Sequence, residues 1–407
     1  GYSNRLVDLA AIVGAAGWVD VPYGVPVLED LPSVEGRSVL VRCDFNVPLR
    51  DGEIADDHRI RAALPTLEWL TSRGAEVTAV THLGRPKGAP DPAFDVAPVR
   101  ARLAELAPGV TLGENLRFSP GETANDPDFV DELVAGHDLY VNDAFGASHR
   151  AHASIVGPPS RLPSAAGRLL AQEVSVLLDL RRQPRRPFVA ITGGAKVSDK
   201  LGVIRALLNI ADEILIGGGM CFTFFAAMGH SVGSSLLEPD RVDDCRALLD
   251  EFGDRLVLPT DVVALGPGGR LGDPSAGGEV RNTGRSLPEG WMGLDIGPGA
   301  AAEFGDRIAE ASTVLWNGPM GVFEDPRFEA GTRSVAQSVA DCRGFTVIGG
   351  GDSAAAIAQF GLDDRVDHIS TGGGASLELI EQGDLPGLEA LRRAPNAATD
   401  DDDDETE

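Results

Sequence analysis

The chain has 407 residues, which at roughly 100–200 residues per domain predicts two domains. Its 35 Lys and Arg residues against 62 Asp and Glu residues give a formal net charge of −27. This acidic balance excludes nucleic acid and an anionic membrane surface as the main partner, because both require a basic surface. The four cysteines have no CxxC spacing, which predicts neither a zinc site nor a disulfide framework and favours a reducing cytoplasm.

Residues 1–26 form a poorly patterned leader, and a regular alternation of short β-branched runs and helix-period segments begins at Val27. In the first half the predicted strands are Ser38–Cys43, Glu76–Thr81 and Asp138–Asn142, and the predicted helices include Arg59–Ser72 and Pro98–Leu106. In the second half the predicted strands are Phe188–Thr192, Glu213–Ile216, Leu256–Pro259, Thr313–Trp316, Gly344–Ile348 and His368–Ser370. This alternation predicts two α/β domains, each a doubly wound, Rossmann-like parallel sheet covered by helices.

An amphipathic segment between the two halves, Ala165–Leu180, predicts an interdomain helix with a hinge, and a basic run follows it. The cations of that run suit the C-terminus of a solvated helix, which we favour over a binding patch. We place the domain boundary near Pro184, with an N-terminal domain over 27–180 and a C-terminal domain over 181–387.

The last eight residues, Asp400–Glu407, include seven acidic ones. Such a block predicts a disordered tail, so the folded part of the chain carries a charge smaller in magnitude than −27.

Glycine clusters directly follow four of the β-branched runs of the second half. They are Gly193–Gly194, Gly217–Gly219, Gly349–Gly351 and Gly372–Gly374. In a doubly wound sheet the carboxyl ends of the strands form the ligand crevice, where helix N-termini present free N–H groups to anions. Four such loops predict a nucleotide or polyphosphate site, because tight strand–helix packing accounts for one or two at most. The motifs of P-loop NTPases and protein kinases are absent, which excludes both classes.

Two of only three lysines, Lys196 and Lys200, follow the first glycine loop four residues apart. At the start of a helix this spacing projects both ammonium groups from one face, which destabilises the helix by roughly 0.2–0.5 kcal/mol unless an anion lies there. A nucleotide phosphate is the natural candidate. Asp352, at the end of its glycine loop, is placed to hold Mg²⁺, which prefers one or two carboxylates plus phosphate oxygens. The alternative interpretation of Asp352 is a helix N-cap.

Basic side chains in the first half follow its predicted strands. They are Arg59, Arg85, Arg117 and Arg150, with His82 and His149 nearby in sequence. Because the planar guanidinium group binds carboxylate and phosphate through two parallel hydrogen bonds, converging arginines predict a small, doubly anionic substrate.

Longer motifs carry a resemblance to a known family. In the first half they are Val41–Pro48, Thr81–Pro86, Glu114–Phe118 and Asn142–His152. In the second half they are Gly193–Lys200, Gly217–Phe224, Trp291–Pro298, Leu315–Glu324, Gly349–Ser353 and Ser370–Leu379. In this order, from about Val27 to Leu391, the chain resembles phosphoglycerate kinase.

The resemblance implies reversible transfer of a phosphoryl group from 1,3-bisphosphoglycerate to MgADP, giving 3-phosphoglycerate and MgATP in glycolysis or gluconeogenesis. It implies Mg²⁺ with ATP or ADP as the co-substrate, and a monomer. It also implies that the C-terminal segment, at about 388–399, returns to the first domain.

Carried over position by position, the resemblance implies two groups of site residues. The 3-phosphoglycerate site comprises Asp44, Asn46, Arg59, His82, Arg85, Arg117 and Arg150. The nucleotide site comprises Gly194, Ala195, Lys196, Lys200, Gly218, Gly293, Asn317, Pro319, Gly321, Val322, Glu324, Asp352 and Ser353. Glu324 is expected to bond the ribose and Asp352 to hold the metal, and Ser353 replaces the usual Thr while keeping its hydroxyl.

Phosphoryl transfer depends on positioning and cationic stabilisation more than on covalent work. We assign Arg59 and Lys200 to the transferring phosphoryl group and Lys196 to the nucleotide and transferring phosphates. The helix starts at Gly350 and Gly373 are assigned to the same charge. No general base is needed, because the carboxylate leaving group is a weak base and the attacking ADP oxygen is already anionic.

Domain closure is expected to bring the two substrates in line and to exclude water. We expect Ala165–Leu180 and Leu388–Leu391 to act at the hinge.

Two other functions remain as alternatives, a dinucleotide-dependent oxidoreductase and a catalytically silent scaffold of the same fold. The GxGxxA match at Gly297–Ala302 does not open a convincing βαβ unit with a later acidic residue, which disfavours the first. The presence of Arg59, Lys196, Lys200 and Asp352 disfavours the second.

Overall fold

The computed structural model describes residues 23–396, so the acidic tail and nearly all of the predicted leader lie outside the described residues. Within this range the chain divides into two compact units. Residues 23–178 and 382–396 make up the N-terminal unit, and residues 179–381 make up the C-terminal unit. Helix α7 (Arg168–Arg182) carries the chain from the first to the second, so the division falls within this helix.

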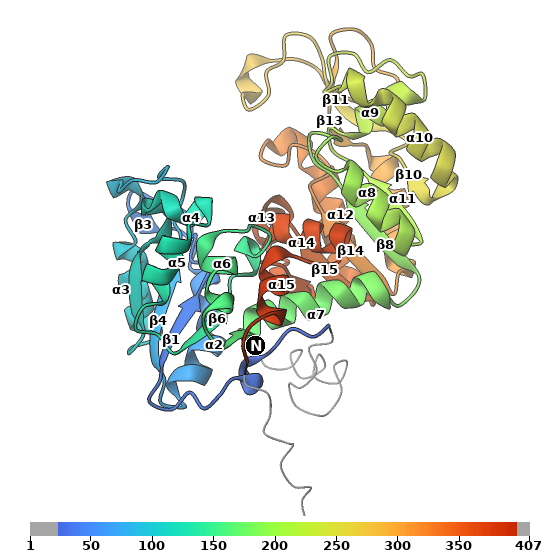
Figure 1. Ribbon diagram of the computed structural model, residues 1–407. Coiled ribbons are helices and arrows are strands. Elements are labelled where there is room, and N and C mark those ends of the chain that lie inside the picture. The colour runs from blue at the N-terminus through green and yellow to red at the C-terminus, as the bar shows by residue number, and fades with distance from the viewer. Residues whose placement is uncertain (1–22, 397–407) are drawn as a thin grey trace, which may run out of the picture. The chain divides into compact units, whose positions relative to one another are not determined.

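The N-terminal unit is built on a parallel sheet with strand order β5-β4-β1-β6-β7. Its strands are β1 (Ser38–Arg42), β4 (Glu76–Thr81), β5 (Thr111–Asn115), β6 (Leu139–Asn142) and β7 (Ser164–Ala166). Its helices are α2 (His58–Thr71), α3 (Ala97–Leu106), α4 (Pro120–Ala124), α5 (Pro127–Val134), α6 (Ala153–Val156) and α15 (Pro386–Arg392). A short hairpin pairs β2 (Leu49–Arg50) with β3 (Glu53–Ile54). Figure 1 shows β1, β4 and β6 side by side at the centre of this unit.

Strand β1 is apolar on both faces, as expected for a strand at the centre of a covered parallel sheet. Val39, Leu40 and Val41 are fully buried, and Val39 and Val41 pack with the apolar sides of α2 and α3. Chain order runs outward from β1 to β4 and β5 on one side, and from β6 to β7 on the other. The carboxyl ends of β1 and β6 therefore form a topological switch point, where doubly wound sheets bind ligands.

The C-terminal unit contains a six-stranded parallel sheet with strand order β10-β9-β8-β14-β15-β16. Its strands are β8 (Phe188–Thr192), β9 (Glu213–Ile216), β10 (Leu256–Val257), β14 (Thr313–Asn317), β15 (Phe345–Gly349) and β16 (His368–Ile369). Its helices are α8 (Leu201–Ile210), α9 (Cys221–Ala227), α10 (Val242–Phe252), α11 (Pro298–Glu310), α12 (Ala330–Asp341), α13 (Gly351–Gln359) and α14 (Gly373–Gln382). Here the switch point lies between β8 and β14.

A second sheet in the C-terminal unit was not predicted. It is antiparallel, with the order β12-β11-β13, and comprises β11 (Val262–Leu265), β12 (Val280–Thr283) and β13 (Met292–Ile296). Strand β12 is largely exposed and has the sequence Val-Arg-Asn-Thr, so it lacks the apolar run that identified the other strands.

The predicted class, two doubly wound parallel-sheet domains, is confirmed. The predicted helix Ala165–Leu180 is wrong at its start, because residues 164–166 form strand β7 and the helix begins at Arg168. Asp143 explains this start, since its Oδ1 accepts hydrogen bonds from the backbone N–H groups of Leu169, at 3.0 Å, and Leu170, at 3.3 Å. The capping carboxylate lies so close to Gly167 that a Cβ there would stand 2.2 Å from Oδ1. This long-range cap leaves no local pattern in the sequence.

Candidate active site

In the N-terminal unit, the loop after β1 carries two of the predicted substrate residues. Asp44 is buried and accepts a hydrogen bond at 2.9 Å from Nη1 of Arg59, which α2 presents one residue after its start. Burial opposes the charge on Asp44, but the Arg59 and Arg42 guanidinium groups outweigh it and lower the pKa of this carboxyl. The side-chain oxygen of Asn46 accepts from the backbone N–H of Gly84 at 2.9 Å, which ties the β1 and β4 loops together.

The loop after β4 carries His82, which is buried, and Gly84, whose carbonyl accepts a hydrogen bond at 2.9 Å from Nη1 of Arg117. Burial, reinforced by the guanidinium of Arg42, lowers the pKa of His82 to about 3, so this imidazole is neutral in ordinary buffers. Burial and the charge of Arg42 also lower the pKa of Arg117, and Nε of Arg117 is buried without a hydrogen-bond partner. Neighbouring guanidinium groups and an N–H donor without an acceptor form an environment that a bound anion stabilises.

Arg85 and Arg150 are exposed at the rim of this region. Arg85 lies close enough to Arg117 to lower its pKa, and Arg150 acts in the same way on His149 and His152. The structure therefore brings Asp44, Asn46, Arg59, His82 and Arg117 into one connected group, with Arg85 and Arg150 around it.

A buried polar chain, which no sequence pattern predicted, adjoins this group. Arg42, in the last position of β1, is fully buried and donates hydrogen bonds to Ser154 Oγ at 2.8 Å and His82 Nδ1 at 3.0 Å. Ser154 in turn donates to Glu122, which is also fully buried. The only signal in the sequence was a charged residue within an apolar strand, and the partners of Arg42 are 40 and 112 residues away.

In the C-terminal unit, three glycine-containing loops meet at the switch point between β8 and β14. A Cβ on Gly218 would lie 2.5 Å from the backbone nitrogen of Gly194 and 3.0 Å from the carbonyl oxygen of Pro319. A Cβ on Gly193 would lie 2.0 Å from the same carbonyl. Backbone–backbone bonds join the loops, from Gly218 N to Met320 O at 3.0 Å and from Met220 N to Gly194 O at 3.1 Å. Glycine is needed here because the loop backbones approach too closely for any side chain.

Lys200 reaches the centre of these loops, where its ammonium group donates a hydrogen bond to Oδ1 of the buried Asn317 at the end of β14. Burial lowers the pKa of Lys200, and the charges of Asp352 and Asp199 oppose that shift. The ammonium therefore lies in a partly desolvated position beside a carboxylate.

The predicted placement of the two lysines on one helix face is wrong. Helix α8 begins at Leu201, so Lys200 is its N-cap residue and Lys196 lies in the preceding loop. The segment Lys196–Lys200 instead forms a turn, in which Ser198 donates from its N–H at 3.1 Å and from its hydroxyl to the carboxylate of Glu238. Burial opposes the charge on Glu238, but the hydrogen bonds from Ser198, and to a smaller extent the charge of the exposed Lys196, lower the pKa of this carboxyl.

Two helix N-termini adjoin Asn317. A Cβ on Gly350, the N-cap residue of α13, would lie 2.9 Å from the side-chain nitrogen of Asn317, and a Cβ on Gly373 would lie 2.7 Å from Cα of Gly350. The interpretation of Asp352 as an N-cap is wrong, because Asp352 lies in the first turn of α13 and its side chain is exposed. Ser353 is fully buried, and its hydroxyl accepts a hydrogen bond at 2.6 Å from the N–H of Gly318.

The other predicted nucleotide residues lie along β13 and the loop after β14. Gly293 packs against Phe222 so closely that a Cβ would stand 2.1 Å from the ring. Gly321 packs in the same way against Asp295, and the N–H of Val322 donates to Leu294 O at 2.9 Å. Ala195 and Glu324 are exposed. Among the described residues, none forms a hydrogen bond with the carboxylate of Glu324.

A metal site made by the protein alone is not found, since no three His, Cys, Asp or Glu side chains within residues 23–396 are grouped to hold an ion. Asp352 offers one exposed carboxylate beside Lys200 and the N-terminus of α13. A single carboxylate fits Mg²⁺ that is bound mainly through nucleotide phosphates and water.

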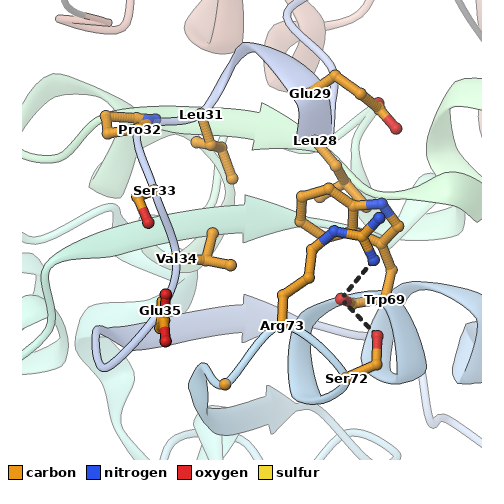
Figure 2. Close-up of a pocket in the computed structure, with 11 residues that line it drawn as sticks. Leu28, Glu29, Leu31, Pro32, Ser33, Val34, Glu35, Trp69, Ser72 and Arg73 are labelled. Carbon is orange, nitrogen blue, oxygen red and sulfur yellow. Dashed lines mark hydrogen bonds between the residues drawn. The ribbon is translucent and has the colours of Figure 1, made fainter.

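A surface hollow on the N-terminal unit lies at the amino ends of the strands, opposite the loops that carry the predicted site residues. Figure 2 shows it between the segment 28–35 and the end of α2, where the Arg73 guanidinium stacks 4.2 Å from the Trp69 ring. Segment 28–35 precedes β1, and Gly74 precedes β4, so the hollow adjoins the amino ends of these strands. It therefore contains none of the predicted site residues.

Two doubly wound units, one with a group of arginines and one with glycine loops around a lysine at the switch point, define a two-domain α/β phosphotransferase. A profile of the phosphoglycerate kinase family matches residues 28–112 and 106–383. The chain is 52% identical to the phosphoglycerate kinase of Rubrobacter xylanophilus over 382 residues, which cover 88% of this chain and 96% of that protein. It is 52% identical to the phosphoglycerate kinase of Frankia alni over 401 residues, which cover 89% and 99%.

Among solved structures, the phosphoglycerate kinase from Coxiella burnetii is similar, with a TM-score of 0.82 and 34% identity over 91% of this chain and 100% of that one. The enzyme from Pyrococcus horikoshii gives a TM-score of 0.77 and 31% identity, covering 90% and 98%. The chain belongs to the phosphoglycerate kinase family. Its reaction is the glycolytic phosphoryl transfer between 1,3-bisphosphoglycerate and ADP, and the two alternative functions are not favoured. No helix within residues 23–396 is long and apolar enough to cross a bilayer.

Proposed function

We propose that the two switch points divide the reaction between them, with 3-phosphoglycerate bound in the N-terminal unit and the Mg²⁺–nucleotide in the C-terminal unit. The observation that carries this proposal is the environment of Lys200, a partly buried ammonium at the β8/β14 switch point, surrounded by glycine loops and adjacent to a carboxylate. Close backbone approach, a cation and nearby helix N-termini are the groups that bind polyphosphate.

Lys200 is the proposed cation for the transferring phosphoryl group in the C-terminal unit. Its hydrogen bond to Asn317 holds the ammonium beside the N-termini of α13 and α14, so the cation and both helix dipoles act on one region. The transition state carries charge on its equatorial oxygens, which such preorganised groups stabilise. Lys196, which is exposed in the loop before Lys200, is proposed to bind the nucleotide phosphates as well.

Asp352 is proposed to hold Mg²⁺ when the nucleotide is bound. When present, the ion neutralises phosphate charge. Asp352 supplies one hard oxygen ligand and is exposed, so the phosphate oxygens and water can complete the ion's coordination. The exposed carboxylate of Glu324 is proposed to bond the ribose hydroxyls.

The N-terminal unit is proposed to bind 3-phosphoglycerate through Arg59, Arg85, Arg117 and Arg150, with His82, Asp44 and Asn46. Support comes from the excess of cations there and from the unpaired Nε of Arg117. Arg59 is bonded to Asp44 at 2.9 Å, and it is proposed to turn toward the transferring phosphoryl group during the reaction. Closure of the domains would bring the reactants in line, and a smaller X-ray scattering radius with both substrates than without them would support it.

Two substitutions test the assignment of the cations. Arg59→Ala and Lys200→Ala are each expected to lower kcat by about 10²–10⁴-fold, the range that single electrostatic groups contribute in other enzymes. The matched controls are Arg61→Ala, an exposed arginine on the same helix, and Lys87→Ala, an exposed lysine in the other unit. A kcat close to that of the unaltered protein for Arg59→Ala or Lys200→Ala would remove that residue from the role.

We also propose that the protein is located in the cytoplasm. Cys43, Cys221, Cys245 and Cys342 are all free thiols, which supports a reducing compartment such as the cytoplasm.

A further inference from the structure

Arg42 is fully buried at the end of β1, yet no carboxylate among the described residues forms an ion pair with it. Its guanidinium donates from Nε to Ser154 Oγ at 2.8 Å, from Nη2 to His82 Nδ1 at 3.0 Å, and from Nη1 to the carbonyl of Cys43. Buried charges are normally paired, because their removal from water is costly. The position of the counter-charge therefore needs an explanation.

Ser154 connects Arg42 to that counter-charge. Its hydroxyl donates to Oε1 of Glu122 at 2.7 Å, and its backbone N–H donates to Oε2 at 2.9 Å. Glu122 is fully buried, and Tyr140 fixes the serine further by donating to its carbonyl at 2.6 Å. Arginine can only donate, so Ser154 Oγ must accept from Nε and direct its single proton to Glu122. The direction of every hydrogen bond in the chain is determined.

The position of the proton on His82 is determined in the same way. Because Nη2 of Arg42 can only donate, Nδ1 of His82 must accept, and an accepting Nδ1 leaves the ring proton on Nε2. A protonated ring would direct an N–H at the arginine N–H. Nε2 has no hydrogen-bond partner among residues 23–396, so it is free to donate. The other charged groups that act on this ring are Asp44, Arg59 and Arg117.

We propose that Glu122, Ser154 and Arg42 form a positioning relay that fixes His82 with its proton on Nε2 and thereby gives the substrate site a permanent neutral N–H donor. The inference deepens the proposed function, because it rests on His82 belonging to the 3-phosphoglycerate site. The three relay residues act through His82 and are positioning residues. The only cations that bind the substrate are then the arginines, and His82 contributes an oriented hydrogen-bond donor.

The relay is tested first in the free protein, without substrate. In ¹⁵N-histidine-labelled protein, two-bond ¹⁵N–¹H correlations are expected to show His82 as the Nε2–H tautomer, with no titration between pH 5 and 8. In Ser154→Ala, His82 is expected to show tautomer averaging, because Arg42 loses its anchor and no longer holds Nδ1 as an acceptor. The matched control is Ser164→Ala, which removes another fully buried serine hydroxyl, one that bonds only the Leu162 carbonyl. His82 unchanged in Ser154→Ala would overturn the proposal.

Two further variants test the relay if the Ser154→Ala protein does not fold. Ser154→Thr keeps the hydroxyl and is expected to keep the Nε2–H tautomer, whereas Glu122→Gln keeps the shape of the side chain and is expected to lose it. Retention of the Nε2–H tautomer in Glu122→Gln would contradict the relay, as it would in Ser154→Ala.

Enzyme kinetics distinguish the relay from the assignment of His82 to the 3-phosphoglycerate site. Ser154→Ala is expected to raise KM for 3-phosphoglycerate roughly tenfold, the effect of one hydrogen bond to an anion, with kcat changed less than about twofold. An unchanged KM together with tautomer averaging would show that the relay exists but does not serve the substrate, which overturns the functional half of the proposal. If His82→Gln also leaves KM unchanged, the assignment of His82 to the substrate site fails, and the tautomer measurement still decides the relay.

Discussion

The close packing of the glycine loops makes Gly218→Ala the sharpest perturbation of the proposed nucleotide site. Gly218 has a φ of +69°, and its Cβ would lie 2.5 and 2.6 Å from the backbone nitrogen and oxygen of Gly194. Ordinary contact begins at 3.4 Å, so the two loops must separate by 3.4 − 2.5 = 0.9 Å. Gly361 has nearly the same φ, +68°, with nothing within 4 Å of a Cβ, so Gly361→Ala shares the backbone strain without the collision.

The difference between the two variants isolates the collision. Backbone strain of about 1–2 kcal/mol applies to both, and overpacking adds roughly 1–3 kcal/mol in Gly218→Ala alone. Because a displacement of about 1 Å in a catalytic loop can reduce rates ~10²-fold, kcat/KM for ATP is expected to fall about 100-fold in Gly218→Ala and to stay within about twofold in Gly361→Ala.

Thermal melts and an ATP-dependent coupled assay measure both effects. Equal losses of stability in the two variants, or an unchanged kcat/KM for ATP in Gly218→Ala, would refute the claim that close loop contact shapes the nucleotide site.

Three further predictions concern single side chains. Asp352→Asn is expected to raise the Mg²⁺ concentration for half-maximal activity about tenfold or more, while the exposed Asp363→Asn control does not; equal Mg²⁺ curves would exclude Asp352 as a ligand. Ser353→Ala leaves the Gly318 N–H without its acceptor and is expected to lower stability by about 1–3 kcal/mol in denaturant melts, while Ser353→Thr restores it. Burial raises the pKa of Asp143 to about 7, above its usual 3.8, so the folded protein holds a proton that the unfolded chain has released. The stability that this group contributes is fully present below about pH 4 and is lost as the pH rises to about 7. Asp143→Asn is therefore expected to reduce this loss of stability in melts between pH 4 and 7. Parallel curves of stability against pH for the two proteins would contradict this.

The sequence predicted those strands of the parallel sheets that are rich in apolar and β-branched residues, but it missed β5, whose sequence is Thr-Leu-Gly-Glu-Asn, and the short strand β7. Glu76–Thr81, Phe188–Thr192 and Glu213–Ile216 have the predicted bounds, since each ends at a clear turn signal. Strand β12 and the start of α7 could not be predicted, because β12 is exposed and polar and the α7 cap comes from Asp143, some 25 residues earlier.

The sequence placed the site residues on the correct loops more reliably than it placed their side chains. The glycine motifs predicted loops at the strand ends, and the fold places them there. The orientation of Lys200 toward Asn317 depends on a turn at Lys196–Lys200, where helical spacing gave the wrong geometry. The chain from Glu122 to His82 is assembled from four separate segments, so no local spacing reveals it.

The most direct test of the central claim is the rate of ADP formation from ATP in the presence and absence of 3-phosphoglycerate, followed in one coupled assay with Mg²⁺ and with the metal chelated. The account predicts turnover that requires both 3-phosphoglycerate and Mg²⁺ and that falls at least about 10²-fold in Lys200→Ala, with Lys87→Ala unaffected. ATP turnover that does not depend on 3-phosphoglycerate, or full activity in Lys200→Ala, would contradict it.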